Sequence, residues 1–259
     1  MPSHYAHYRF GSRAITAFPP EVRRVVRQFR PMYDAGLHGP DIFFYHNILF
    51  RDNIVKLGAD THRQTGEEFF TRICKRLRLE PNEAALAYLY GVLTHYCLDS
   101  TVHPFVFECT QEGNINHVEL ETEFDRYLLQ LDGNRQPNTF DCSPHIRLTW
   151  GECVTAADFY PSVSPTAVSL SIRGMASAVK WLAMPNGSLR RTVETAVGSK
   201  LRHHFMGRTP NKNCAHLNGD LLAHYTAAEE KLPAMVSALQ AHMSHNAALG
   251  TLFEATFNG

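Results

Sequence analysis

The sequence has no excess of either charge and no long apolar run. Its 259 residues include 25 Lys and Arg against 25 Asp and Glu, so the formal net charge is zero, and the cations do not gather in blocks. This excludes the basic footprint of a typical nucleic-acid-binding protein and a cationic patch that steers a chain to a membrane. No apolar stretch approaches the roughly 20 residues that span a bilayer, so no transmembrane helix is predicted.

Cysteine is sparse and irregularly placed, and the first residues lack the features of a leader. The six cysteines form no CxxC motif and no regular framework, which argues against a disulfide scaffold. The segment MPSHYAHYRF has no basic region followed by an apolar run, so no signal peptide is expected. We therefore expect a cytoplasmic protein whose thiols stay reduced.

Signals for β-strands are absent as well. No segment alternates apolar and polar residues between hairpin turns, and no repeat of 20–50 residues stands out. Apolar residues instead recur at helical spacing, as in the long segment that Pro81–Asn82 opens and that Pro104 is expected to end or kink. The expected fold class is all-α: a single-domain multi-helix bundle over residues 1–259, with a metal-ligand half at 1–130 and a helical wall at 131–259.

The richest stretch of potential metal ligands lies between His95 and Glu121, in a chain with fifteen histidines. Ligand-type residues recur there four apart, as His95, Asp99 and His103, and again as His117 and Glu121. Residues four apart on an α-helix lie one turn apart on the same face. Two facing helices that direct His and carboxylate side chains inward build multi-metal sites in helix bundles.

A single pair of this kind is usually a surface or hydrogen-bonded pair without metal. Here two pairs and an intervening histidine lie in a stretch that is otherwise rich in apolar residues. Burying that many ionisable groups costs several kcal/mol unless something pairs with them. Because bound cations would offset this cost, the pattern favours a metal centre.

Asp41 is a further candidate. It follows a turn rich in Pro and Gly, stands at the start of the apolar run IFFYHNILF, and is flanked by His38 and His46. A carboxylate at such a turn beside aromatic residues suits a metal ligand or a general base. A role as a helix N-cap is an equally open interpretation of the spacing.

The remaining candidates lie on other predicted helices. His4 and His7 belong to a helix expected over residues 3–17, which Ser3 is placed to cap. His62 lies near the start of a helix expected within 58–78, with Thr61 or Thr65 as its cap. Residues 132–160 are polar and rich in turns, and are expected to form a long excursion that could pass over the site. Two residues after Glu121 are expected to support the ligands rather than to bind metal: Asp125 and Arg126.

The ligand pattern resembles a known family. HYxxDxxxHP followed by HxxxE is similar to the zinc-dependent phospholipase C family, whose secreted bacterial members are all-α enzymes with a three-zinc cluster. The segments AHYRFG, HGPDIFFYH, TGEEFF and EFDRYLL resemble the cytoplasmic bacterial branch of that family. The resemblance covers roughly residues 1–130. It implies the following ligands in chain order: His7, Asp41, His62, His95, Asp99, His103, His117 and Glu121.

The resemblance also implies how these ligands divide among two or three zinc ions. The first zinc would be held by Asp41, His62, His95 and Asp99. The second would be held by His103, His117 and Glu121. A third would share Asp99 with His7. In secreted members the free N-terminal residue of the mature chain completes this third site, and here His4 or water would take its place.

Such a cluster suits the hydrolysis of phosphate esters. We therefore expect a zinc-dependent phosphoric ester hydrolase of the phospholipase C type, acting on a phosphodiester or phospholipid, with Asp41 orienting or deprotonating the attacking water. Two alternatives stay open: a phosphodiesterase similar to the fungal single-strand-specific nucleases, and a non-catalytic helical protein stabilised by metal. The neutral charge argues against a nucleic-acid partner, whereas transient contact with a membrane surface is compatible with it. Substrate identity and oligomeric state are not encoded in any motif.

Overall fold

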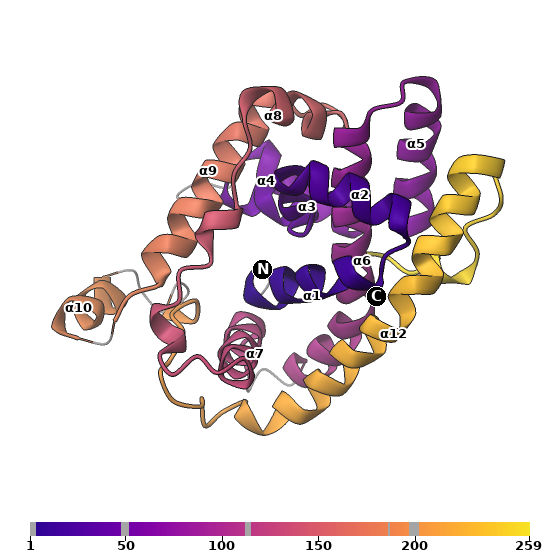
Figure 1. Ribbon diagram of the computed structural model, residues 1–259. Coiled ribbons are helices and arrows are strands. Elements are labelled where there is room, and N and C mark those ends of the chain that lie inside the picture. Colours follow the sequence, from indigo (N-terminus) through magenta and orange to yellow (C-terminus); the bar gives the residue numbers. More distant parts are fainter. Residues whose placement is uncertain (1–3, 48–51, 112–114, 186, 197–201) are drawn as a thin grey trace.

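Helices make up the regular structure of the chain. The computed structural model describes residues 4–47, 52–111, 115–185, 187–196 and 202–259, and no β-strand occurs in this part (Figure 1). The α-helices of the described residues are α1 (His4–Ala17), α2 (Pro20–Gln28), α3 (Arg30–Gly36), α4 (Asn53–His62), α5 (Gly66–Leu79), α6 (Glu83–Thr110), α7 (His117–Leu131), α8 (Trp150–Ala157), α9 (Pro165–Leu182), α10 (Ser188–Ala196) and α12 (Asn218–His245). Short 3-10 segments include η1 (Gly39–Tyr45) and η3 (Ser143–His145). The predicted all-α class is confirmed.

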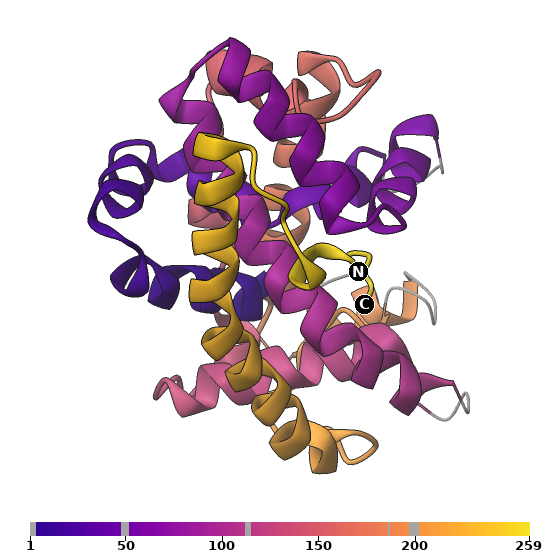
Figure 2. The ribbon, with the colours of Figure 1, turned by 90° about the vertical axis from the view of Figure 1, so that its right-hand side faces the viewer.

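The long helix α6 runs through the middle of the molecule, with α12 beside it (Figures 1 and 2). Asn82 begins the helix, because its side chain accepts a hydrogen bond from the backbone N–H of Ala85. Nearly every residue from Ala87 to Ser100 is buried, so this part of the helix is surrounded by protein. Helices α1, α2, α3 and α12 all pack against it.

Helix α3 crosses α6 with almost no side chain between the two backbones. A Cβ atom at Gly91 would lie 2.3 Å from the carbonyl oxygen of Tyr33, and one at Gly36 would lie 2.5 Å from that of Tyr88. Side chains cannot be accommodated at such distances, so the crossing depends on glycine at both positions. The close approach holds the segment after α3, which contains Asp41, against the middle of α6.

Helix α6 does not end at Pro104. The prediction that this proline would end the helix is wrong. The helix continues to Thr110. A proline in a helix interior removes one hydrogen bond and costs about 3 kcal/mol. Here the side chain of Val106 is buried and anchors the next turn. The backbone carbonyl oxygen of Val106 also accepts a hydrogen bond from the Thr110 hydroxyl. Because tertiary packing outweighs the local preference, His103 keeps its helical position one turn after Asp99.

Helix α7 sets the position of α1. The Asp125 carboxylate accepts hydrogen bonds from the backbone N–H groups of Tyr5 (3.0 Å) and Ala6 (2.7 Å), in the first turn of α1. Such N–H groups have no partner within their own helix, and a carboxylate also interacts favourably with the helix dipole. Asp125 therefore stabilises the start of α1 and ties it to α7. The predicted cap, Ser3, lies outside the described residues.

The second half of the chain packs on the first, and buried apolar side chains from both halves form one contiguous cluster. A buried ion pair helps to join them. Arg126 donates two hydrogen bonds to Glu123, and Glu123 also accepts from the Asn211 backbone and the Asn218 side chain. This pair fixes the chain at the start of α12. Residues 132–160 contain helix α8, and their η3 segment returns to α3 and α9.

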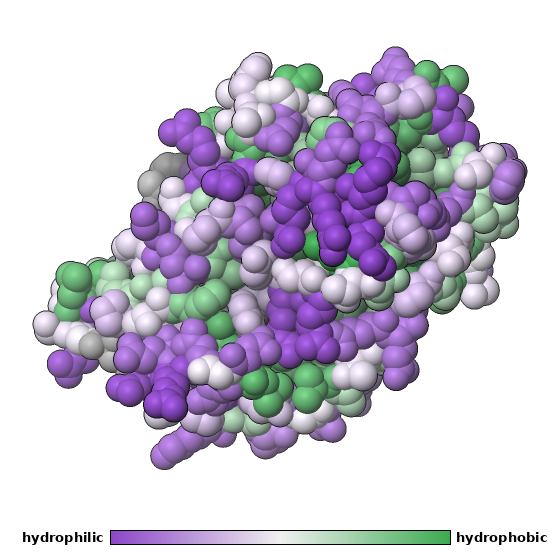
Figure 3. Space-filling model, in the orientation of Figure 1, coloured by the Kyte–Doolittle hydropathy of each residue, from purple (hydrophilic) through white to green (hydrophobic). Residues whose placement is uncertain are grey.

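The surface is mixed in character. On the face shown in Figure 3, polar side chains gather above the centre, and an apolar patch lies at the end formed by α10, where Leu189 is 68% exposed. None of the helices described here is both long enough and apolar enough to cross a bilayer.

Candidate metal centre

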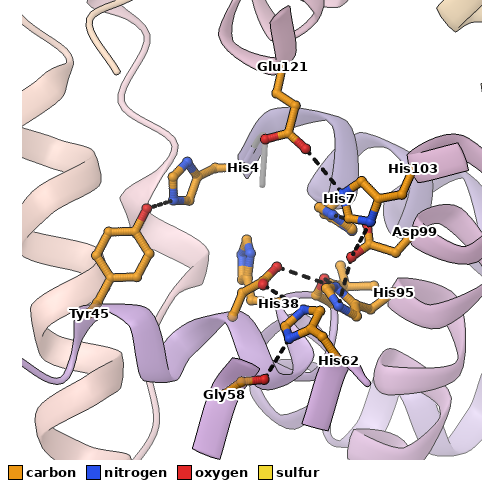
Figure 4. A network of polar contacts seen from close by, with 12 residues as sticks. His4, His7, His38, Tyr45, Gly58, His62, His95, Asp99, His103 and Glu121 are labelled. Atoms are coloured by element: carbon orange, nitrogen blue, oxygen red, sulfur yellow. Dashed lines mark hydrogen bonds and ion pairs between the residues drawn. The ribbon is translucent and has the colours of Figure 1, made fainter. Parts of the chain in front are cut away.

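Three ligand-type residues stand one turn apart on α6. His95, Asp99 and His103 are all buried, and they lie on one face of the helix as the four-residue spacing predicts. Asp99 stands between the two histidines: its Oδ2 atom lies 3.3 Å from His95 Nε2 and 3.7 Å from His103 Nδ1. The helix therefore presents a row of alternating nitrogen and oxygen atoms that could bind a metal (Figure 4).

Asp41 reaches this row from η1. The chain turns at Gly39, whose φ of +47° favours glycine, and a Cβ atom there would lie 2.8 Å from Cδ2 of His95. The Asp41 N–H then donates to the His38 carbonyl oxygen at 2.9 Å. The Asp41 carboxylate is 1% exposed and faces His62 and His95, whereas the cap position of η1 is occupied by His38. The N-cap interpretation of Asp41 is therefore wrong.

His62 approaches Asp41 from the end of a helix and not from the start of one. Helix α4 ends at His62, and α5 begins after Thr65, which forms a reciprocal capping box with Glu68. The sequence predicted one helix within 58–78 with His62 near its start, and the structure has the end of one helix and the start of another there. Thr65, one of the two predicted caps, does cap the second helix. The Nε2 atom of His62 lies 3.0 Å from Asp41 Oδ1.

Two histidines are oriented by backbone carbonyl groups. Nδ1 of His62 lies 2.7 Å from the Gly58 oxygen, and Nδ1 of His95 lies 3.2 Å from the Leu37 oxygen. A carbonyl oxygen only accepts, so each Nδ1 carries the proton and a neutral ring has its lone pair at Nε2. These Nε2 lone pairs are directed at carboxylate oxygens, which repel them unless a proton or a metal cation lies between. The pattern is typical of histidines that bind metal through Nε2.

The α1 helix adds His7 to the same place. His7 Nε2 lies 3.0 Å from Asp99 Oδ1, and the His7 ring stacks on the His95 ring at a centroid distance of 4.6 Å. One potential ligand atom from each of His7, Asp41, His95 and Asp99 lies within 4.8 Å of all the others. His62 contacts this four-residue group through Asp41 and is not a member of it.

A second group lies next to the first. His103 Nε2 and His117 Nε2 lie 3.2 Å and 3.1 Å from the same Glu121 oxygen, and one ligand atom from each of the three residues lies within 4.8 Å of the others. Helix α7 provides His117 and Glu121 at the predicted spacing of one turn. Because His103 also approaches Asp99, the two groups are neighbours.

Charge pairing in the site is strong. Burial opposes ionisation of Asp99, yet the rings of His103, His95 and His7 hold its pKa well below the usual range. Burial likewise opposes protonation of His103, but Asp99 and Glu121 raise the His103 pKa to about 9. Burial dominates at His95 and lowers its pKa to about 4, so this ring is neutral at pH 7. A neutral His95 leaves its Nε2 lone pair available to a cation.

The donor set fits a bound metal. Among the described residues, no hydrogen-bond partner is found for five buried side-chain atoms of this site: His7 Nδ1, Asp41 Oδ2, His95 Nε2, Asp99 Oδ2 and His103 Nδ1. Buried polar atoms are rarely left unpaired, because each such atom costs about 1–3 kcal/mol. Imidazole nitrogen and carboxylate oxygen are suitable ligands for zinc. Coordination would satisfy His95 Nε2 and the two carboxylate oxygens together.

Other predicted residues take different places. His4 Nε2 lies 2.8 Å from the Tyr45 hydroxyl, and His4 contributes to neither four-residue nor three-residue group. Asp125 acts on α1, which carries His7, and Arg126 pairs with Glu123 away from the ligands.

The sequence assigned no role to His145. Its Nε2 atom lies 2.8 Å from Nε2 of His38. His38 and His145 are 107 residues apart in the chain. No spacing rule links residues at that separation, so no local signal could have revealed the pair.

Comparisons with known proteins place these residues in a family. The family model described as zinc dependent phospholipase C matches residues 6–160, a span that contains both ligand groups and His62. Comparisons with curated proteins and with solved structures found no match. The matched span is more than half of the chain, and its helices carry the converging histidines and carboxylates of both groups. The chain belongs to the zinc dependent phospholipase C family.

Proposed function

We propose that the protein is a zinc-dependent hydrolase of phosphodiesters, similar to phospholipase C. Family membership supports a phosphoester or lipid substrate. The observation that carries the proposal is the orientation of His62 and His95, whose Nδ1 atoms are engaged by backbone carbonyls while their Nε2 atoms face carboxylates. A structural hydrogen-bond network would have paired these atoms with donors.

The ligand assignment follows the three-residue group as it stands, and in the four-residue group it replaces His7 by His62, which contacts Asp41. We infer that Asp41, His62, His95 and Asp99 hold one zinc, and that His103, His117 and Glu121 hold a second. His7 contacts both Asp99 and His95, and this supports a third ion at His7 and Asp99. Zinc, when bound, supplies the Lewis acidity that stabilises negative charge on phosphoryl oxygens.

Asp41 is the proposed general base. It is a buried member of the four-residue group, and its Oδ2 atom has no hydrogen-bond partner in the part of the chain that the structure describes. In the hydrolysis, a water oxygen bonds to phosphorus, the bond from phosphorus to the leaving alcohol oxygen breaks, Asp41 accepts a proton from the water, and the departing oxygen gains a proton. His62 lies next to Asp41 Oδ1 and would help to hold the carboxylate in place by sharing an ion with it.

The test combines metal content with hydrolysis. Elemental mass spectrometry of the purified protein is expected to find two or three zinc ions per chain, with fewer in His95→Ala and His117→Ala. The zinc-loaded protein is then offered a nitrophenyl phosphodiester, phospholipid vesicles and single-stranded DNA. Hydrolysis of the ester or the lipid supports the proposal. Hydrolysis of the DNA alone would favour a nuclease-like enzyme, and bound zinc without any hydrolysis would favour a metal-stabilised helical protein.

A further inference from the structure

A second pair of histidines lies beside the metal centre and is not part of it. His38, which is fully buried between α3 and η1, has its Nε2 atom 2.8 Å from Nε2 of His145 in η3. The His145 ring stacks on Tyr8 of α1 at a centroid distance of 4.0 Å, which holds it in place. The third neighbour is Cys142, whose sulfur lies 4.0 Å from His145 Nδ1.

His38 lies beside the metal centre. Its carbonyl oxygen accepts the N–H of Asp41, and its ring lies 6.1 Å from the ring of His4. Figure 4 places the His38 ring between His4 and the His62–His95 side of the site. Its Nδ1 atom is buried and has no hydrogen-bond partner among the described residues. A buried polar atom of this kind, next to a ligand cluster, calls for a partner that the chain does not supply.

The number of protons on the His38–His145 pair decides whether His38 Nδ1 needs a hydrogen-bond acceptor or a donor. Two neutral imidazoles carry one N–H each, and one of these must lie between the two Nε2 atoms. It follows that exactly one of the two Nδ1 atoms, at His38 or at His145, carries the other proton. The 2.8 Å separation of the two Nε2 atoms leaves room for one proton between them, and a neutral pair satisfies this contact without a buried charge.

Cys142 favours one of the two arrangements. Burial raises the pKa of its thiol well above the usual range, so the sulfur keeps its proton and can donate it weakly. His145 Nδ1 then accepts from Cys142, His145 Nε2 donates to His38 Nε2, and His38 Nδ1 carries a proton. A ring in this state presents a fixed hydrogen-bond donor to the metal centre.

We propose that His38 Nδ1 donates a hydrogen bond to an oxygen of the phosphate group bound at the metal centre, and that His145 holds His38 in this donor state. The inference rests on the proposed function, because it takes a phosphoryl group as the occupant. The oxygens of an ionised phosphodiester carry no proton and only accept hydrogen bonds, so they match an N–H donor at His38 Nδ1 and not a lone pair. His38 is thus a substrate-contacting residue, and His145 is a positioning residue.

The first experiment measures the binding of inorganic phosphate to the zinc-loaded protein by calorimetry. His38→Leu removes the donor and is expected to weaken phosphate binding about 10-fold to 100-fold, the effect of one hydrogen bond to a charged group. His38→Asn places an amide N–H near the Nδ1 position and is expected to restore most of the affinity. The control is His216→Ala, at an exposed histidine of the 3-10 segment Ala215–Leu217 that belongs to neither ligand group, and it should bind phosphate as the wild type does.

Three results would overturn the inference. Unchanged phosphate affinity in His38→Leu would show that the donor is not used. An affinity lowered equally in His38→Leu and His38→Asn would assign the loss to packing. Loss of one zinc per chain in His38→Leu would make His38 a metal ligand. If the wild type binds zinc and phosphate but hydrolyses no ester, the proposed function fails and the contact at His38 stands.

The second experiment tests the role of His145 by nitrogen-15 NMR of the zinc-loaded protein. His38 is expected to carry its proton at Nδ1, and phosphate should shift that N–H signal downfield. His145→Phe keeps a ring on Tyr8 but removes the donor, and is expected to give a mixture of the two His38 tautomers with weaker phosphate binding. A proton found at His38 Nε2 in the wild type would refute the proposed order of donors.

Discussion

The turn at Gly39 offers a sharp test of how the backbone positions the metal ligands. In Gly39→Ala the new Cβ would lie 2.8 Å from Cδ2 of His95, whereas ordinary contacts begin at 3.4 Å, so the ring must move by about 0.6 Å. Zinc–nitrogen distances tolerate only about 0.2 Å. The left-handed φ adds about 1–2 kcal/mol for a residue other than glycine, and the clash about 1–3 kcal/mol. We expect a total loss of about 2–5 kcal/mol in stability and much weaker zinc binding.

A matched control separates the two costs. Gly133 also has a positive φ, of +84°, but no atom lies within 4 Å of its Cβ position. Gly133→Ala should therefore lose only the backbone cost and keep full zinc affinity. Urea unfolding of the zinc-free variants, followed by helical circular dichroism, gives the free energies, and competition with a chromogenic chelator gives the affinities. Equal destabilisation and equal zinc affinity in the two variants would refute the claim that Gly39 positions His95.

Three further predictions concern the base, the anchor of α1 and the protons of the site. Asp41→Asn is expected to lower the turnover of a phosphodiester about 100-fold to 10,000-fold while most of the zinc stays bound, and unchanged turnover would remove Asp41 as the base. Asp125→Ala removes the carboxylate that accepts from the backbone N–H groups of Tyr5 and Ala6. We expect the free energy of unfolding, measured by thermal melting, to fall by about 1 kcal/mol, with weaker zinc binding at His7. A variant that melts like the wild type would show that α1 needs no such anchor. In the metal-free protein, burial opposes protonation of His103, but Asp99 and Glu121 raise its pKa to about 9. The raised pKa stabilises the fold fully below the unfolded value of about 6.5, and this contribution is lost as the pH rises through about 9. Zinc binding at pH 7 should accordingly release about one proton from His103, measured by calorimetry in two buffers of different ionisation enthalpy, and no buffer dependence would contradict it.

Local spacing explains what could be predicted about the site. His95, Asp99 and His103 share one helix face because they are four residues apart, and His117 and Glu121 do so for the same reason. These relations hold wherever the helices pack. The structure brings His103, His117 and Glu121 together, as the pattern predicted, and their roles as zinc ligands stay a prediction.

Packing decided several features that spacing could not. Helix α6 continues past Pro104 because Val106 is buried in the core, although the local preference of proline is to stop a helix. His7 joins the compact four-residue group, whereas His62 contacts it through Asp41. That difference depends on the positions in which α1 and α4 pack relative to α6.

The sequence by itself determined the helical class and the ligand pairs within each helix, because both follow from periodicity over a few residues. Only the tertiary structure decided which pairs face one another, how Gly36 and Gly91 let α3 approach α6, and that His145 meets His38. The physical reason is separation along the chain. Contacts between residues a hundred positions apart depend on the packing of whole helices, and no short pattern records that packing.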